Sequence, residues 1–100
     1  MANQSIVGRL RDIAVRYSRD EVTLPELQQA VMAHGLAIEG APAGWYELIN
    51  DVEGRLELIR FMVDASSQRD AALLELSRVR DAADAFGLGW SSDVFTGSGD

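Results

Sequence analysis

Hydrophobic residues recur along residues 43–65 at the spacing of an α-helix. At about 100° per residue, one group of them falls within an arc roughly 100° wide, which is typical of a stripe facing a protein core. Its members are Trp45, Leu48, Ile49, Val52, Leu56, Ile59 and Val63. Leu58 and Phe61 fall outside this arc, on a second side of the helix. That side is either covered, by the first helix or by Trp90 and Phe95 near the C-terminus, or it faces a partner.

The segment 23–34 begins with the clearest helix signal in the chain. Thr23 and Glu26 form the pattern T-x-x-E, a capping box in which each side chain bonds to the backbone of the other residue. Pro25 costs little in the first turn, because the first N–H groups of a helix have no partner within it. Gly35 follows the segment, where a left-handed residue commonly ends a helix. We therefore expect a helix that begins after Thr23 and stops at a left-handed Gly35.

Two further segments, 5–18 and 67–86, also repeat apolar residues at helical spacing. Ser66 or Ser67 is placed to cap the second of these segments, and Gly87 is placed to stop it. The faces expected to be buried are Ile6, Leu10, Ile13 and Tyr17 in the first segment, and Ala72, Leu76, Val79, Ala83 and Phe86 in the second. No segment shows the sustained alternation of a β-strand.

The four segments predict an all-α fold, a single-domain four-helix bundle over residues 1–95 with short connections. The chain has 100 residues, of which 47% are hydrophobic, and this is enough for one core. Trp90, Val94 and Phe95 are too apolar for a solvated tail, so we expect this partly ordered part to pack on the bundle or on a second copy. Residues 96–100 are expected to form a flexible tail.

Composition narrows the class of protein. Because the chain has no cysteine, disulfides, thiol catalysis and cysteine-ligated zinc are excluded. The longest apolar run is only a few residues, against the roughly 18 that a membrane span needs. The N-terminus also lacks the pattern of a secretory signal. We expect a cytoplasmic protein that does not enter a membrane.

Charges are unevenly distributed along the chain. The formal net charge is −7, and all nine basic residues are arginines. Residues 1–19 hold four arginines and one aspartate, a local +3, whereas residues 20–100 hold five arginines and 15 acids, a local −10. The acidic bulk should repel nucleic acid and attract basic surfaces, so no nucleic-acid partner is expected. The four arginines of residues 1–19 are expected to face acids of the third or fourth helix.

The residue combinations that carry catalysis or bind a cofactor are missing from the sequence. His34 is the only histidine, so a transition-metal site would have to consist mostly of carboxylates. No nucleophile elbow, zinc-binding H-E-x-x-H or phosphate-binding glycine loop occurs. The carboxylate pairs Glu47/Asp51 and Glu53/Glu57 are each one helical turn apart, which is typical of a solvated face and not of two carboxylates across a cleft. We expect no enzyme, no metal and no cofactor.

The acids of segment 43–65 favour protein binding instead. An apolar centre with a charged rim is the composition of a protein-binding patch, and acids would steer a basic partner toward it. The candidate contacts are Glu47, Asp51, Glu53, Glu57, Leu58 and Phe61. The alternative is a structural or regulatory homodimer that buries Leu58 and Phe61 in a two-fold contact.

Two stretches resemble small acidic all-α immunity proteins of bacterial polymorphic-toxin systems, of the contact-dependent and bacteriocin-like kinds. SRDEVTLPELQQAV (18–31) is similar to the helix entry of several such families. WYELI (45–49), followed by LELIRF (56–61), is similar to their central helix. The resemblance spans residues 17–86, consists of hydrophobic spacing and assigns no functional residue. It implies a cytoplasmic antidote that binds a cognate toxin, often a nuclease, through an acidic face.

Overall fold

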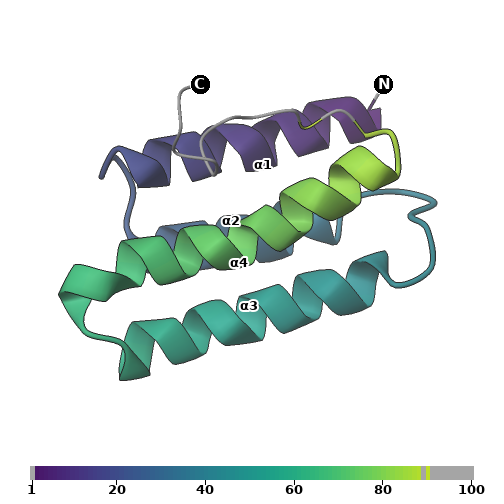
Figure 1. Ribbon diagram of the computed structural model, residues 1–100. Helices are drawn as coiled ribbons and strands as arrows, with labels where there is room; N and C mark the ends of the chain where they lie inside the picture. The colour runs from purple at the N-terminus through teal and green to yellow at the C-terminus, as the bar shows by residue number, and fades with distance from the viewer. Residues whose placement is uncertain (1, 89, 91–100) are drawn as a thin grey trace.

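The structure is a computed structural model that describes residues 2–88 and 90. These residues form four α-helices: α1 (Ala2–Ser18), α2 (Leu24–Gly35), α3 (Trp45–Met62) and α4 (Ala65–Ala85). Figure 1 shows them side by side as a bundle, in which α2 and α4 each pack against both α1 and α3. α1 and α3 therefore lie diagonally across the bundle. The predicted all-α four-helix bundle is confirmed, and the tail predicted over 96–100 lies outside the described residues.

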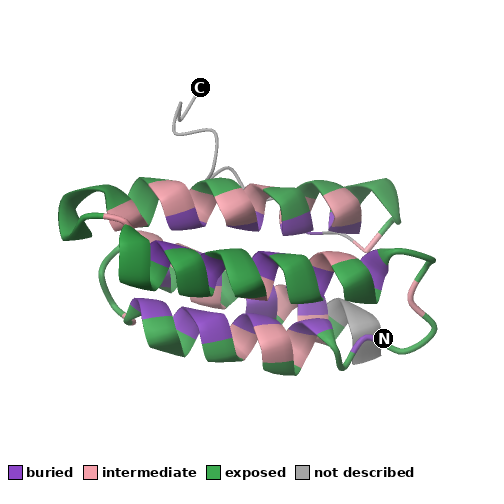
Figure 2. Ribbon diagram, turned by 90° about the horizontal axis from the view of Figure 1, so that it is seen from below, coloured by how far each residue is buried: buried purple, intermediate pink, exposed green. Residues whose placement is uncertain are grey.

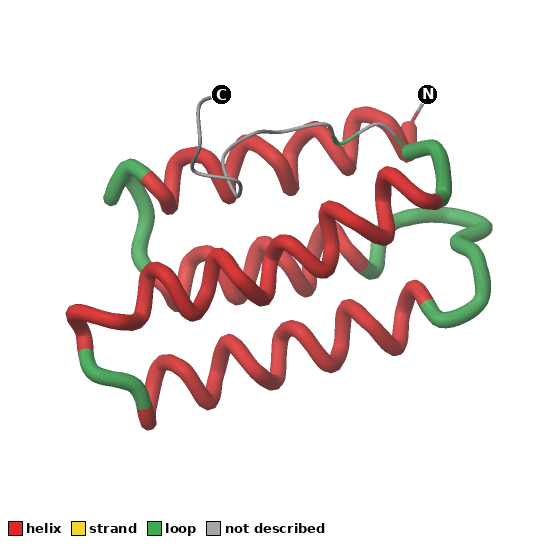
Figure 3. Tube along the Cα trace, in the orientation of Figure 1, coloured by secondary structure: helices red, strands yellow, loops and turns green. Residues whose placement is uncertain are grey.

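The connections gather at the two ends of the bundle. Figure 3 shows the α1–α2 and α3–α4 connections at one end, and the α2–α3 connection at the other. Within the α2–α3 connection, Ile38 is buried in the core and Leu36 is exposed. Among residues 2–88 and 90, no helix is long and apolar enough to cross a membrane.

The break between α3 and α4 lies earlier in the chain than the sequence predicts. Val63 leaves the helix in an extended conformation, and the chain enters α4 directly after Asp64. Asp64 is the N-cap residue of α4, without a side-chain capping bond, so the predicted cap at Ser66 or Ser67 is wrong. The reason is that two residues are enough to turn the chain here. The serines already belong to the first turn, where the Ser67 N–H donates to the Asp64 carbonyl oxygen at 2.8 Å.

Two predicted helix ends are confirmed. At the start of α2, the Thr23 N–H donates to the Glu26 carboxylate at 2.7 Å, and the Glu26 N–H donates to the Thr23 hydroxyl oxygen at 3.3 Å. These two bonds are the predicted capping box. After α4, Gly87 has the predicted left-handed backbone, with φ +74°.

Gly35 is not the left-handed residue that the sequence predicts. It is the last residue of α2, it is buried, and its lack of a side chain is required by packing. A β-carbon at this position would lie 2.7 Å from atoms of the Ile49 side chain on α3. The indole Nε1 of Trp45 also donates to the Gly35 carbonyl oxygen at 2.8 Å. Gly35 therefore sets how closely the end of α2 approaches the start of α3.

Each helix turns one side toward a shared core, as the buried positions in Figure 2 show. The stripe predicted for α3 faces this core, and its buried members are Trp45, Ile49, Val52, Leu56 and Ile59. Trp90 is fully buried as well, so the chain after α4 packs on the bundle at this position. Val94 and Phe95 lie outside the described residues.

Two of the predicted buried faces need correction. In α1, Val7 and Ala14 are fully buried, whereas Ile6 and Ile13 pack at the edge of the core. The buried side of α1 is thus rotated from the predicted one, because this helix packs between α2 and α4. Phe86 is 39% exposed, since it lies just past the end of α4.

Candidate functional site

The second side of α3 is uncovered in the described part of the chain. Leu58 is 56% exposed and Phe61 is 68% exposed. Met62, one turn beyond Leu58, is 77% exposed and was not among the predicted contacts. Its position four residues after Leu58 on the same helix is the signal that could have identified it. α1 does not cover this side, because it lies diagonally across the bundle, and the buried Trp90 is part of the core. We call Leu58, Phe61 and Met62 the apolar patch.

The ring of Phe61 is accompanied by a cation. The guanidinium carbon of Arg60 lies 4.7 Å from the centroid of this ring, a cation–π contact. Arg60 also donates a hydrogen bond to the Gln28 side-chain oxygen, at 3.2 Å, across to α2. These two interactions place one positive charge at the edge of the apolar patch.

Glu53 and Glu57 lie on the flank of α3 that faces α2. The amide nitrogen of Gln28 donates to Glu53 at 2.6 Å and to Glu57 at 3.2 Å. Gln28 is the buried polar residue of the described chain, at 6% exposure, and the sequence patterns above do not single it out. Its position four residues after Leu24 on the buried side of α2 is the signal that could have identified it. The two acids therefore help to join α3 to α2.

Asp51 lies on the opposite flank of α3, toward α4. Its carboxylate forms ion pairs with Arg78 of α4 at 2.8 Å and with Arg55 at 3.6 Å. The Arg78 hydrogen bond, with the charge of both arginines, holds the pKa of Asp51 below its usual range. Asp51 is thus engaged in a contact between α3 and α4.

The remaining outer surface of α3 carries little charge of its own. Glu47 is exposed, and it makes no hydrogen bond or ion pair with any other described residue. At Gly54, no side chain and no atom of another helix lies within 4 Å of the place that a β-carbon would take, so no helix approaches it. A shallow hollow of about 350 Å³ is left there beside Leu58.

The six predicted contact residues therefore occupy three sides of α3. Two of the acids face α2, one faces α4, and the outer side presents Glu47, Leu58 and Phe61. They do not form one continuous acid run beside an apolar centre, because a helix distributes neighbouring residues around its axis. Whether any of them contacts a partner stays a prediction.

The expected role of the N-terminal arginines is wrong. In the part of the chain that the structure describes, Arg11 pairs with Asp12 at 3.8 Å and Arg16 pairs with Glu21 at 3.6 Å. No ion pair joins an arginine of α1 to α3 or α4 there, and α3 lies diagonally opposite. The result is a separation of charge across the bundle, with α1 basic and α3 acidic.

The described residues contain no group of three or more His, Asp or Glu side chains arranged to hold a metal ion. Comparisons with protein-family models, with curated proteins and with solved structures give no match for this chain. The functional interpretation therefore depends on the geometry and charges described above.

Proposed function

We infer that this protein is a non-enzymatic protein-binding module and that the apolar patch is the centre of its binding surface. The observation that carries this proposal is the exposure of three large apolar side chains within five residues of one helix, at 56%, 68% and 77%. Scattered exposed apolar residues are ordinary, but a contiguous group on one helix marks an interaction surface. Phe61 is the anchor of this surface, because aromatic side chains dominate the energetics of interfaces.

The charges around the apolar patch favour a basic partner. Asp64, two residues after Met62, is exposed and has no side-chain capping bond. Glu57 borders the patch on the α2 side, and Glu47 lies on the same outer side of α3. Arg60 partly offsets these acids, but the chain as a whole carries −7. Long-range attraction of a basic surface raises the association rate more than the affinity.

The most specific form of this proposal is an immunity-type inhibitor that neutralises a basic toxin. It is supported by the acidity of α3, the uncovered patch and the pattern resemblance at 18–31 and 56–61. Such an inhibitor needs no catalytic group, because binding alone blocks the toxin.

Site-specific photo-crosslinking tests the proposal in the native host. A photoreactive phenylalanine analogue replaces Phe61, and the matched control carries it at Ala33, an exposed position on α2. The proposal expects a heterologous protein with a basic isoelectric point to be attached at position 61 and not at position 33. Attachment of a second copy of the chain alone, or equal products at both positions, would contradict it.

A homodimer through the same side is the second candidate function. On α4, Leu74 is also exposed, at 70%, and offers a further apolar side chain to a second copy. Arg60 and Glu57 border the patch with opposite charges, so two copies could pair them across the axis. Light scattering separates the candidates, because a strictly monomeric protein excludes the dimer.

A further inference from the structure

Nothing in the described fold requires a glycine at position 54. Glycine weakens the interior of a helix, and at Gly35 the contact with Ile49 makes it necessary. At Gly54, no side chain and no atom of another helix lies within 4 Å of the place that a β-carbon would take. The space that is left open belongs to the hollow of about 350 Å³ beside Leu58, which we call the Gly54 hollow.

The charged groups that line the Gly54 hollow already have partners. Asp51 pairs with Arg55 at 3.6 Å and, outside the lining, with Arg78 at 2.8 Å. Leu58 supplies an apolar wall, and the exposed Asn50 completes the lining. Because both lining charges are paired, the hollow does not select an ion, and an apolar side chain can enter it without stripping a free charge of water.

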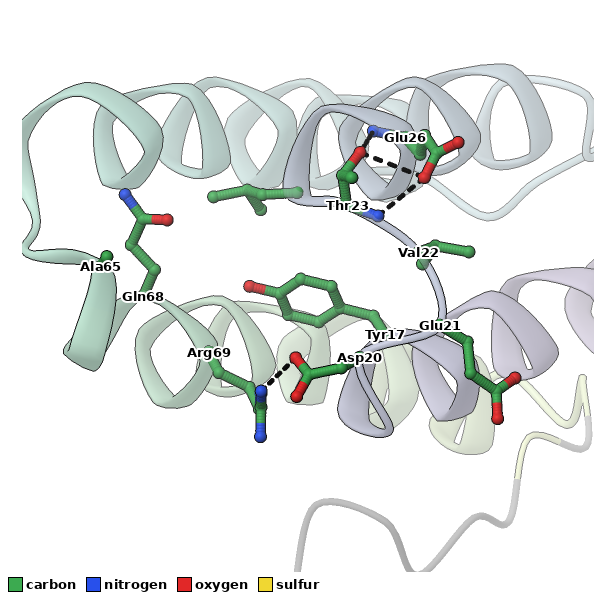
Figure 4. A pocket seen from close by; sticks show the side chains of 10 residues that line it. Tyr17, Asp20, Glu21, Val22, Thr23, Glu26, Ala65, Gln68 and Arg69 are labelled. Atoms are coloured by element: carbon green, nitrogen blue, oxygen red, sulfur yellow. Dashed lines mark hydrogen bonds and ion pairs between the residues drawn. The ribbon is translucent and has the colours of Figure 1, made fainter.

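The hollow at the α1–α2 connection, shown in Figure 4, has different surroundings. Its charged groups are engaged as well, since Asp20 pairs with Arg69 and Glu26 accepts from Thr23. None of its lining residues is among the large exposed apolar side chains, whereas Leu58 of the apolar patch lines the Gly54 hollow. Of these two hollows, only the Gly54 hollow combines an open space with exposed apolar side chains.

The Gly54 hollow and the apolar patch are spaced as two halves of one contact. Gly54, Leu58 and Met62 are each four residues apart, so they follow one row along α3, with a space at one end and a large side chain at the other. A two-fold axis at Leu58 sets the residue four positions after it in one copy against the residue four positions before it in the other. Met62 of each copy then meets the Gly54 hollow of the other copy, and both hollows are filled.

Other arrangements of two α3 helices match less well. In a parallel pair each residue meets its own counterpart, so the two hollows face each other and stay empty. In an antiparallel pair with its axis midway between Gly54 and Leu58, Met62 would lie against the polar Asn50. With the axis at Leu58, the two Leu58 side chains meet and each Met62 fills a space. Close packing and the burial of apolar surface therefore favour the axis at Leu58.

We propose that a second copy of this chain docks antiparallel on α3, with Met62 of each copy in the Gly54 hollow of the other. The second copy occupies the surface assigned to the basic partner, and in this respect alone the proposal rests on the proposed function. Each copy carries −7, so two copies repel each other at long range, whereas a basic partner is attracted. The second copy therefore covers the apolar patch until the partner displaces it.

Sedimentation equilibrium of the full chain tests this contact without the partner. The apolar patch is small, so we expect a reversible dimer with a dissociation constant on the order of 100 µM. The mass should rise from that of one chain toward that of two between about 10 µM and 1 mM. Added salt should strengthen the dimer, because it screens the repulsion between two acidic chains. The mass of one chain throughout, or a dimer that salt weakens, would overturn the proposal.

Gly54→Ala and Gly8→Ala are a matched pair of variants. Gly8 is also helical and has nothing within 4 Å of its β-carbon position, but the described part of α1 has no large exposed apolar side chain. Both alanines should raise the thermal midpoint of unfolding, since each removes a glycine from a helix. Only Gly54→Ala should weaken the dimer, by at least about tenfold, because its methyl group takes the space of Met62 twice in each dimer. Equal dimer affinities of the two variants would overturn docking in the hollow.

Disulfide trapping tests the register, and the chain has no cysteine of its own to interfere. Leu58→Cys lies at the axis and should link to a second Leu58→Cys chain, because a disulfide needs Cα atoms within about 7 Å of each other. Gly54→Cys and Met62→Cys should link to each other, when mixed, faster than either links to itself. Leu74→Cys, exposed on α4, reports the rate of random collisions. A mixed pair that links no faster than Leu74→Cys, or than Gly54→Cys with itself, would overturn the register.

The outcomes separate the self-contact from the proposed function. A dimer in this register, without a basic protein captured at position 61, would retain the self-contact and refute the proposed function. Capture of a basic protein by a chain that stays monomeric would do the reverse. Where both are found, the captured protein should bind the linked Leu58→Cys dimer only after its disulfide is reduced. Binding to the linked dimer would overturn the shared surface.

Discussion

The packing of Gly35 against Ile49 gives the sharpest prediction about this fold. In Gly35→Ala, the new β-carbon would lie between 2.7 and 2.8 Å from three atoms of the Ile49 side chain. Those atoms are buried, and Ile49 is itself fully enclosed by the core, so it has little room to move. Overpacking of this kind costs about 1–3 kcal/mol.

Helix propensity works in the other direction. Gly35 has a helical backbone, so alanine would gain about 1 kcal/mol there if space allowed. We expect the steric term to dominate, because the contact is far inside van der Waals distance and the Trp45 indole is bonded to the same residue. The net expectation is a loss of up to about 2 kcal/mol in the free energy of unfolding.

Gly54→Ala is the matched control. Gly54 is also helical, but no atom of another helix lies within 4 Å of the position that its β-carbon would take. The same substitution should therefore stabilise the protein there, by about 0.5–1 kcal/mol. Urea unfolding of both variants measures the two free energies.

The two substitutions should change the free energy of unfolding in opposite directions. If Gly35→Ala were as stabilising as Gly54→Ala, the close approach of α2 and α3 would be refuted. Adding Ile49→Val to Gly35→Ala removes one of the crowded methyl groups. The double variant should lose less stability than the sum of the two single variants, because the two residues contact each other.

Three further predictions concern stability. Gln28→Leu should lower the free energy of unfolding by about 1–3 kcal/mol, because Glu53, Glu57 and Arg60 all lose their hydrogen bond to Gln28. In the same urea unfolding assay, Gln29→Leu at the adjacent exposed position should change it by less than about 0.5 kcal/mol, and equal effects of the two variants would argue against the role of Gln28 in joining α2 to α3. The Asp51–Arg78 contact should stabilise the protein fully above the ordinary carboxyl pKa of about 4 and lose its effect as the pH falls through the lowered pKa of Asp51. The difference in free energy of unfolding between the parent and Asp51→Asn should therefore vanish in acid, and a difference independent of pH would contradict this. Phe61→Ser should change the thermal midpoint of unfolding little, because Phe61 is exposed, whereas Leu56→Ala in the core should lower the free energy of unfolding by about 2–5 kcal/mol and the midpoint with it. A large fall of the midpoint in Phe61→Ser would mean that Phe61 is covered.

Periodicity and capping chemistry predicted much of the fold because both are local. The stripe of α3 and the capping box of α2 depend on residues within one or two turns of each other, and both are confirmed. Gly87 likewise ends α4 as predicted. Sequence spacing alone was sufficient for these features.

Features that depend on neighbouring helices could not be predicted in this way. Gly35 has the signature of a helix stop, but its role comes from Ile49 on α3, which local spacing does not reveal. The pairing of the N-terminal arginines was predicted wrongly, because the arrangement of the four helices around the core decides which helices touch. The division of the acids between two flanks of α3 follows from the same arrangement.

The central claim is that the apolar patch on α3, with Glu47 on the same outer side of the helix, receives a basic protein. It is tested most directly by the association rate of the partner captured at position 61, measured at low and at high salt. Glu47→Arg reverses a charge on the outer side of α3, and Asp12→Arg makes the same change on α1, diagonally across the bundle. We predict slower association for Glu47→Arg than for Asp12→Arg, with a difference that is largest at low salt. Equal association rates for the two variants at low salt would contradict the account.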